Sequence, residues 1–394
     1  MKQLMQPKIR SLKYVWLTLF LLFFCTACSW FGGDTGKPAQ VKHSSSISNA
    51  APAPIGLGVQ VCPDAVKSPD AWKNTVALGV GQGVERVLCG NLLGIPALQA
   101  VVLVRHTGSD KLLDIFVYSD ITVAHPKAIF DLMGLLHGDA KISGYNTLLT
   151  AQEDRNSLYN KGQTNQWTAD LCREYKWSDA AGALIQVPFS GIFPDLTRYQ
   201  AEFEQREVNN GQGFQQWRLS AVTTTQRFCE ALLKWPLDIP VKVLSGGGDH
   251  DIHATVQVKQ PSSSPITIKL DRLERNTSGG LWEVIDVQTD NLAVTVPHSD
   301  QPLTSPVLVS GHGSGNSTIG TIGTIHTLDH VYNDSGQSEA WDANSTGTIN
   351  FSKPLSYTLS FQGGAQEGVI ALSIKSGSDG RVMGMVMVKV LLSA

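Results

Sequence analysis

The apolar positions of residues 58–240 switch between strand-like and helical spacing. Residues 97–104 (ALQAVVLV) and 112–118 (LLDIFVY) are β-type runs, and the turn-rich segment 105–110 between them predicts a hairpin. Two shorter runs, residues 146–151 and 183–189, also predict strands, whereas residues 72–88 fit either a strand or a short helix.

Three segments of the same part of the chain have helical character. Residues 126–136 (PKAIFDLMGLL) carry apolar side chains at helical spacing, with Pro126 at the start and Gly138 just beyond the end. Residues 168–177 predict a short helix and residues 225–235 (TQRFCEALLKW) an amphipathic one. Residues 58–240 are therefore expected to form an α+β domain.

Residues 241–296 predict an antiparallel β-meander. Three alternating runs, separated by Pro-, Ser- and Gly-rich turns, carry the pattern: residues 251–258, 266–273 and 281–287. The sequence GLWEV at residues 280–284 resembles the last strand of the cone-shaped α+β folds typified by nuclear transport factor two. That resemblance implies that the meander belongs to the same domain as the preceding helices.

Residues 297–394 predict an all-β domain. About seven short strands fit a β-sandwich, and the clearest are residues 306–310, 323–328, 347–351, 356–361, 369–374 and 383–392. Three sequences resemble the immunoglobulin-like domain of bacterial spore germination proteins: VP at 296–297 with PLTSPVLVSG at 302–311, NF at 350–351 with LSY at 355–357, and SGSDG at 376–380. The resemblance implies a non-catalytic immunoglobulin-like sandwich, and His312 departs from the small residue usual after the glycine.

The first residues have the three parts of an export signal. Basic residues precede an apolar run of about eleven residues, which is shorter than the roughly 20 residues needed to cross a bilayer as a helix. The sequence CTAC at residues 25–28 resembles the lipobox of bacterial lipoproteins, which implies cleavage after Ala27 and lipid on Cys28. Residues 1–27 are thus expected to be a signal peptide and residues 28–57, rich in Ser, Gly, Ala and Pro, a flexible tether. An uncleaved anchor and ordinary cleavage without lipid are the alternatives.

Composition narrows the choice of partners. A net charge of −3 without a basic stripe argues against nucleic-acid binding, and charged residues make up only 16% of the chain. The expected partners are a membrane, held through the lipid on Cys28, and a protein or cell-wall component.

Four cysteines remain in the body of the chain: Cys62, Cys89, Cys172 and Cys229. An even number in an exported protein is compatible with two disulfides. Pairing Cys62 with Cys89 and Cys172 with Cys229 closes the shorter loops and is preferred over the two other connectivities. Buried thiols are the main alternative, since the Cys and His spacing does not fit a zinc site.

Candidate catalytic or metal-binding clusters are weak. His250 and His253 follow a glycine-rich turn and would point to opposite faces of a strand. His312 and Ser314 lie in a glycine-rich run without the glycine spacing of a nucleophile elbow, and we interpret them as part of a sandwich loop. Residues 79–84 (GVGQGV) lack the glycine spacing of a dinucleotide-binding site. The carboxylates of residues 153, 154, 170 and 174 are interpreted as a solvated face, and Asp329, Asp334 and Asp342 do not form a calcium ladder. An aromatic-rich stretch, residues 167–214, fits core packing better than an exposed binding surface. No cofactor or metal is expected.

The sequence therefore favours a non-enzymatic, lipid-anchored protein of the cell envelope that binds a protein or an envelope component. The alternative is an envelope hydrolase with its site in residues 58–240. A lipoprotein that captures a solute for a transporter fits less well, because the chain lacks repeated βαβ units.

Overall fold

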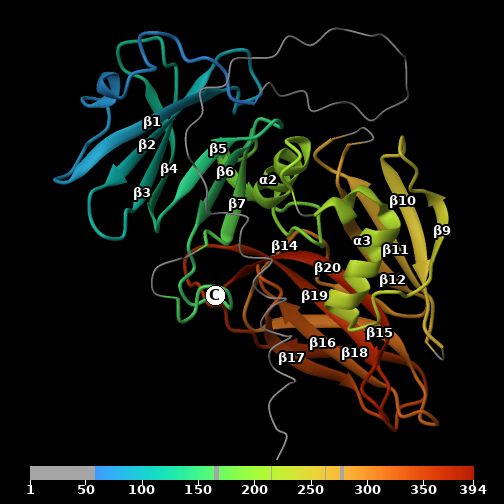
Figure 1. Cartoon of the computed structure of the whole chain (residues 1–394). Helices are drawn as coiled ribbons and strands as arrows, with labels where there is room; N and C mark the ends of the chain where they lie inside the picture. Colours follow the sequence, from blue (N-terminus) through green and yellow to red (C-terminus); the bar gives the residue numbers. More distant parts are fainter. Residues whose placement is uncertain (1–57, 164–167, 214, 262, 276–278) are drawn as a thin grey trace, which may run out of the picture.

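The computed structural model of the chain describes residues 58–163, 168–213, 215–261, 263–275 and 279–394. The predicted signal peptide, Cys28 and the predicted tether lie outside these residues. Antiparallel sheets make up most of the described chain, and the helices lie beside them (Figure 1).

Two four-stranded meanders form the first part of the body. The first sheet contains β1 (Gln82–Gly90), β2 (Gln99–His106), β3 (Leu113–Ser119) and β4 (Lys127–Leu135), and the second contains β5 (Asp139–Ile142), β6 (Leu148–Gln152), β7 (Leu171–Ser178) and β8 (Ala183–Val187). Apolar side chains of both sheets, including Leu103, Ile115, Leu148 and Leu184, share one buried cluster. The two sheets therefore pack against each other, and the predicted hairpin is the β2–β3 pair.

The helices follow the second sheet. They are α2 (Arg198–Asn209), the 3-10 turn η2 (Gln216–Leu219), α3 (Ala221–Phe228) and the π-helical turn η3 (Cys229–Leu233), while a further 3-10 turn, η1 (Pro69–Trp72), lies near the start of the described chain. The hydroxyl groups of Thr197 and Ser220 cap the N-termini of α2 and α3 by accepting backbone N–H groups. The helix expected at residues 225–235 is confirmed as α3 and η3, and α2 was not predicted.

One long sheet runs through the second half of the molecule. Its order is β17-β16-β19-β20-β12-β11-β10-β9, with β14 pairing in parallel with β20. The bounds are β9 (Val241–Gly246), β10 (His253–Val258), β11 (Ile266–Arg272), β12 (Trp282–Thr289), β14 (Gln301–Thr304), β16 (Ile322–Leu328), β17 (Asp334–Trp341), β19 (Gln366–Lys375) and β20 (Val382–Ser393). The meander expected in residues 241–296 is confirmed as β9 to β12.

Strand β20 joins the meander to the C-terminal strands. Val287 of β12 is paired with Met387 of β20, so the sheet crosses the boundary expected between residues 296 and 297. Met385 and Met387 face the cluster under α3 and η3, whereas Val386 and Val388 face the core on the opposite side. The apolar run near the C-terminus therefore reflects a strand that is buried on both faces.

A small sheet completes a C-terminal β-sandwich. It contains β13 (Ala293–Val296), β15 (Val307–Gly315) and β18 (Gly347–Leu355), and its apolar face packs on β16, β19 and β20. The indole of Trp341 lies in a slot between Gly313 of β15 and Gly323 of β16. A Cβ at Gly313 would lie 2.2 Å from the ring, and a Cβ at Gly323 would lie 2.3 Å from it. Ser314 lies in strand β15, and the loop expected there from the sequence is not present.

Three secondary-structure predictions are wrong. The expected helix at residues 126–136 is the edge strand β4, whose backbone pairs with β3 and whose Gly134 has a φ of +75°. The expected helix at residues 168–177 is β7, a central strand of the second sheet bonded to β6 and β8. Residues 356–361 do not form a strand, and the Tyr357 hydroxyl instead donates to the backbone carbonyls of Leu303 and Ser393.

Candidate binding groove

A polar groove of about 370 Å³ lies where α2 meets the turn between β5 and β6 and the end of β11. Figure 1 shows α2 between the strands of the second sheet and the meander. The groove is lined by Gly144, Tyr145, Glu202, Gln205, Arg206, Asn209, Asn210 and Glu274. We call it the α2 groove. Three segments that are distant in the sequence thus contribute to one surface.

Arg198, the first residue of α2, holds these segments together. Its Nε donates to both carboxylate oxygens of Glu174 on β7 at 3.0 Å, and its Nη1 donates to Glu274 at 2.7 Å. Its guanidinium carbon also lies 3.9 Å from the ring centroid of Tyr145. The Tyr145 hydroxyl donates to the carbonyl of Leu273, beside Glu274. Charge-assisted bonds of this kind fix both the carboxylates and the aromatic ring.

A second ion pair supports the other wall. Lys141 Nζ lies 3.0 Å from Glu202 and 4.4 Å from the centroid of the Tyr199 ring. The other oxygen of Glu202 accepts the backbone N–H of Gly144 at 3.4 Å. Both Lys141 and Glu202 are about one-fifth exposed, so the pair borders the groove and does not lie deep in the core.

The groove presents neutral hydrogen-bonding groups beside these charges. Burial raises the pKa of Glu274 to about 8, although the guanidinium of Arg198, which donates to this carboxyl group, opposes the shift. The Asn209 carbonyl accepts from Gln205 at 3.0 Å and from Arg275 at 2.9 Å. Among the described residues no hydrogen bond uses the Asn209 Nδ2, which leaves two N–H donors for a ligand. The arrangement suits a ligand rich in hydroxyl groups.

Buried charges behind α2 keep the helix in place. Arg218 of η2 is fully buried and donates to Asp195 at 2.7 Å and to Glu283 of β12. These two carboxylates raise the pKa of Arg218 against the effect of burial. Burial raises the pKa of Glu204, on the inner face of α2, to about 7.

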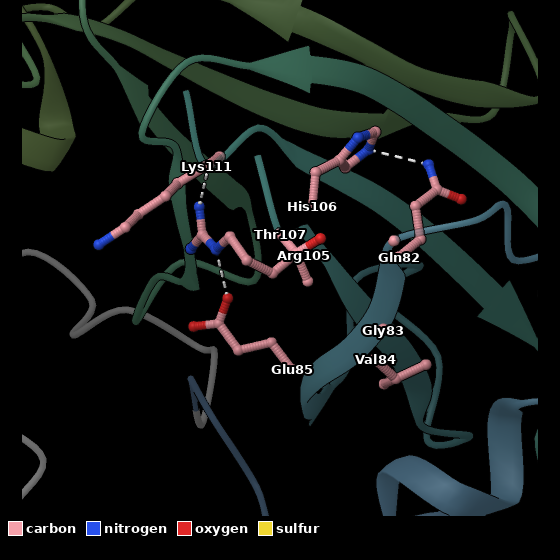
Figure 2. Close-up of a pocket in the computed structure, with 9 residues that line it drawn as sticks. Gln82, Gly83, Val84, Glu85, Arg105, His106, Thr107 and Lys111 are labelled. Atoms are coloured by element: carbon pink, nitrogen blue, oxygen red, sulfur yellow. Dashed lines mark hydrogen bonds and ion pairs between the residues drawn. The ribbon is translucent and has the colours of Figure 1, made fainter. Parts of the chain in front are cut away.

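A second hollow, of about 660 Å³, lies at the start of β1 and the end of β2 (Figure 2). It is lined by residues 81–85, residues 105–107 and Lys111. The glycine-rich segment considered above for nucleotide binding therefore lies on a surface hollow, opposite the loop between β2 and β3.

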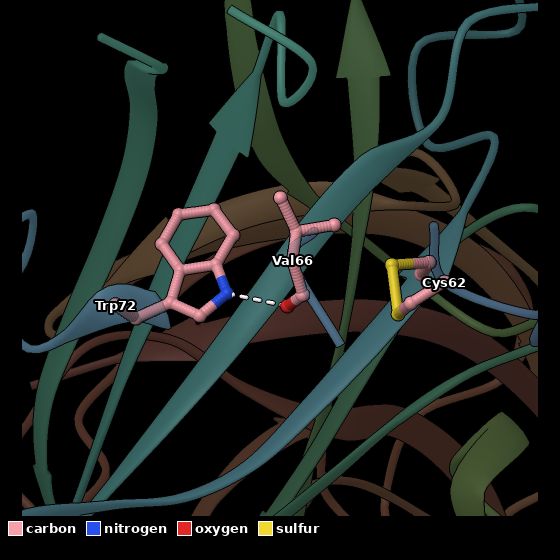
Figure 3. Close-up of a disulfide and its surroundings, with 4 residues drawn as sticks. Cys62, Val66 and Trp72 are labelled. Carbon is pink, nitrogen blue, oxygen red and sulfur yellow. Dashed lines mark hydrogen bonds between the residues drawn. A yellow bond between two sulfur atoms is a disulfide. The ribbon is translucent and has the colours of Figure 1, made fainter. Parts of the chain in front are cut away.

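The predicted Cys62–Cys89 disulfide is present and ties the segment before η1 to β1 (Figure 3). Trp72 packs nearby, with its Nε1 donating to the Val66 carbonyl at 2.7 Å. The second expected pair is wrong: Cys172 and Cys229 are buried in different clusters and neither is disulfide-bonded. Loop length alone could not show that Cys172 lies in the second sheet and Cys229 under the meander.

The four carboxylates expected on a solvated face are all buried, so that interpretation is wrong. Glu153 lies 2.9 Å from His137, and Glu174 is held by Arg198. Asp154 and Asp170 both lie near His330, at 3.8 and 3.9 Å from its Nε2. Their partners come from distant segments, so the local sequence did not reveal them.

The other sequence candidates do not converge on a common site. His250 lies in the turn after β9 and His253 pairs with Asp271 at 2.7 Å. Asp329 and Asp342 accept backbone N–H groups of their own turns, and Asp334 pairs with His326. Of the aromatic stretch, Phe189, Phe193 and Tyr199 are buried, as expected for core packing, and Trp167 and Phe214 lie outside the described residues. Within the described chain, no cluster of three or more His, Cys, Asp or Glu side chains is arranged to hold a metal ion.

The sequence did not single out Tyr145, Arg198, Glu202 or Glu274. Comparison with models of known protein families and with curated proteins gives no match to this chain. Of the helices in the described part of the chain, none is long and apolar enough to span a membrane.

Proposed function

We propose that the chain is an exported, lipid-anchored protein of the bacterial cell envelope that binds a wall glycan in the α2 groove without transforming it. The observation that carries the proposal is the fixed set of polar side chains in the groove. The lipid anchor on Cys28 rests on the lipobox resemblance at residues 25–28.

The chemistry of the groove favours a glycan over a strongly charged ligand. Arg198 bonds to the carboxyl groups of Glu174 and Glu274, and Lys141 pairs with Glu202, so the acidic groups at the groove already have basic partners. Sugar hydroxyl groups both donate and accept hydrogen bonds. They match the amide of Asn209 and the carboxyl group of Glu274.

A second candidate function, the envelope hydrolase, is favoured by one observation. Glu274, whose pKa burial raises, and a second carboxylate, Glu202, both line the groove, and glycoside hydrolases use a pair of carboxyl groups as acid and base. Release of shorter glycan products would establish this function, whereas binding without products supports the first.

The finer fold assignments are also proposals. Parallel pairing of β14 with β20, beside an antiparallel sandwich, supports an immunoglobulin-like arrangement for residues 297–394. The packing of α3 and η3 on β10, β11 and β12 supports a cone-like α+β unit. Neither fold implies catalysis by itself.

Site-specific cross-linking in intact cells tests the proposal. A photoactivatable residue replaces Asn209 in the groove, and another replaces Asn350, an exposed residue of β18, as the control. Mass spectrometry of the membrane-isolated protein is expected to show a lipid-modified N-terminus at Cys28 and glycan attached at position 209 alone. A chain that retains residues 1–27, or one recurrent protein attached at 209, contradicts the proposal.

A further inference from the structure

The hollow at the start of β1 and the end of β2 has a wall of hydrogen-bonded polar side chains, and none of them lines the α2 groove. Asp114 of β3 is buried and accepts three hydrogen bonds. These come from His106 at 2.7 Å, from Gln82 at 3.2 Å and from the backbone N–H of Gly134 at 2.7 Å. The His106 Nε2 lies 2.7 Å from this carboxylate and 2.9 Å from the Gln82 side-chain nitrogen, so two contacts fix the orientation of the imidazole.

Arg105 is fixed on the neighbouring wall. Its Nε donates to Glu85 at 2.6 Å and its Nη1 donates to the carbonyl of Lys111 at 2.9 Å. Figure 2 shows the guanidinium between the Glu85 carboxylate and the Lys111 backbone. No hydrogen bond within the described chain uses the Arg105 Nη2, so part of this guanidinium remains available to a ligand in the hollow.

Lys111 supplies a positive charge on the wall of the hollow. It is exposed, and among the described residues no carboxylate lies within ion-pair distance of its ammonium group. Its φ of +40° is unusual for a residue with a side chain. Its backbone N–H donates to the Gly108 carbonyl at 3.1 Å, and its carbonyl accepts from Arg105. The hydroxyl group of Thr107 lines the same hollow as an additional donor.

The charges select the class of ligand. Among the residues that line the hollow, Glu85 balances Arg105 and Lys111 adds one positive charge, while the carboxylate of Asp114 is buried behind His106. A guanidinium, an ammonium and a hydroxyl group are the donors that proteins direct at phosphate oxygens. The Glu85 carboxylate at the rim would repel a second negative charge.

We propose that this hollow binds a singly charged phosphodiester, with Arg105, Lys111 and Thr107 contacting its oxygens and with His106 and Asp114 fixing the wall behind it. The diester belongs either to a lipid headgroup or to a soluble molecule, and glycerophosphoglycerol serves as the soluble probe. This site is separate from the α2 groove, so its test does not depend on glycan binding.

Two probes and two variants test the proposal. A chain of residues 29–394 contains every described residue and lacks the lipid-bearing cysteine. It is titrated with glycerophosphoglycerol by calorimetry and sedimented with vesicles of phosphatidylglycerol and phosphatidylcholine. The variant Lys111→Asn removes the charge and keeps a residue that tolerates left-handed backbone. Lys234→Asn is the matched control, because Lys234 is also exposed and has a φ of +58°.

The expected result is binding that Lys111→Asn weakens by about tenfold, as for loss of one charge-assisted contact, and that Lys234→Asn leaves unchanged. Binding of both probes, or of glycerophosphoglycerol alone, supports a site for the diester itself. Lysine-dependent binding of vesicles alone supports a lipid-headgroup site. Binding of neither probe at millimolar concentration, or equal loss in the two variants, overturns the proposal.

Discussion

Glu274 makes the stability of this protein depend on pH in a defined direction. Its pKa is raised from 4.5 to about 8 by burial. The folded protein therefore keeps a proton that the unfolded chain releases above pH 4.5. The contribution of Glu274 to stability is fully present below that pH and is lost as the pH rises towards 8. Glu204 and Glu367, whose pKa values burial raises to about 7, act in the same direction.

The variant Glu274→Gln removes this contribution, because glutamine resembles the protonated acid and still accepts the Arg198 N–H. It is expected to match the wild type in free energy of unfolding at pH 5 and to exceed it by about 1–3 kcal/mol at pH 8. Urea titrations at the two pH values measure the difference. Glu339→Gln, at an exposed position of β17, is the control, and identical pH profiles for the two variants would disprove the shift.

His330 illustrates a second residue-scale effect of burial. Burial alone would lower the pKa of His330, but the nearby carboxylates of Asp170, Asp329 and Asp154 raise it. Its stabilising contribution is present at low pH and is lost as the pH rises through the raised pKa. The positive charge of the protonated ring, 3.8 and 3.9 Å from Asp154 and Asp170, offsets part of the cost of burying both.

At the residue scale, the sequence identified individual candidate residues better than it identified the residues with which they pair. The Cys62–Cys89 pair was predicted because it closes a short loop. The buried carboxylates were misread because acids are almost always exposed unless they are paired. The partners Arg198 and His330 lie 24 residues or more away, so no local spacing indicated the pairing.

At the scale of elements, the slot for Trp341 explains the glycines of β15 and β16. A Cβ at Gly323 would lie 2.3 Å from the indole, which is far inside contact distance. Gly323→Ala is therefore expected to lower the free energy of unfolding by about 2–3 kcal/mol through overpacking.

The matched control is Gly83→Ala, since Gly83 also lies in a strand and has open space where a Cβ would be. It is expected to change stability by less than about 0.5 kcal/mol. Denaturant unfolding compares the two variants. Equal stability of Gly323→Ala and Gly83→Ala would show that the indole does not fill the slot.

The elements that were predicted correctly have an unambiguous local period. The β2–β3 hairpin, the meander β10 to β12 and the helix α3 all belong to this class. Strands β4 and β7 were mistaken for helices because half-buried edges and buried polar residues disturb strict alternation. Strands β4 and β7 are stabilised by hydrogen bonds to neighbouring strands, and a local sequence pattern does not reveal such bonds.

At the scale of the molecule, buried charged groups join the second sheet to the C-terminal sandwich. Arg173 of β7 donates to the carbonyls of Ala365 and Gly363, and Ser360 donates to Asp154. Lys389 of β20, also buried, lies 3.3 Å from Glu367 and donates to Leu196 at 2.6 Å. Removing one partner of such a pair leaves a buried charge, at a typical cost of about 3–5 kcal/mol.

This arrangement differs from a chain of separate domains. The sequence predicted the β-rich C-terminal sandwich, and it contained a sign of the continuous sheet in the apolar run of β20. It did not show that β12 pairs with β20, because pairing between strands about 100 residues apart leaves no periodic signal. The α2 groove depends on the same long-range assembly, since it combines residues 145, 202 and 274.

The most direct measurement of the central claim is a calorimetric titration of residues 29–394 with soluble cell-wall glycan fragments. The account predicts binding without shortened products. It also predicts about tenfold weaker binding by the double variant Asn209→Ala, Asn210→Ala, which removes groove amides, and no change for Asn350→Ala. An absence of binding, or equal affinities for the two variants, would contradict the account.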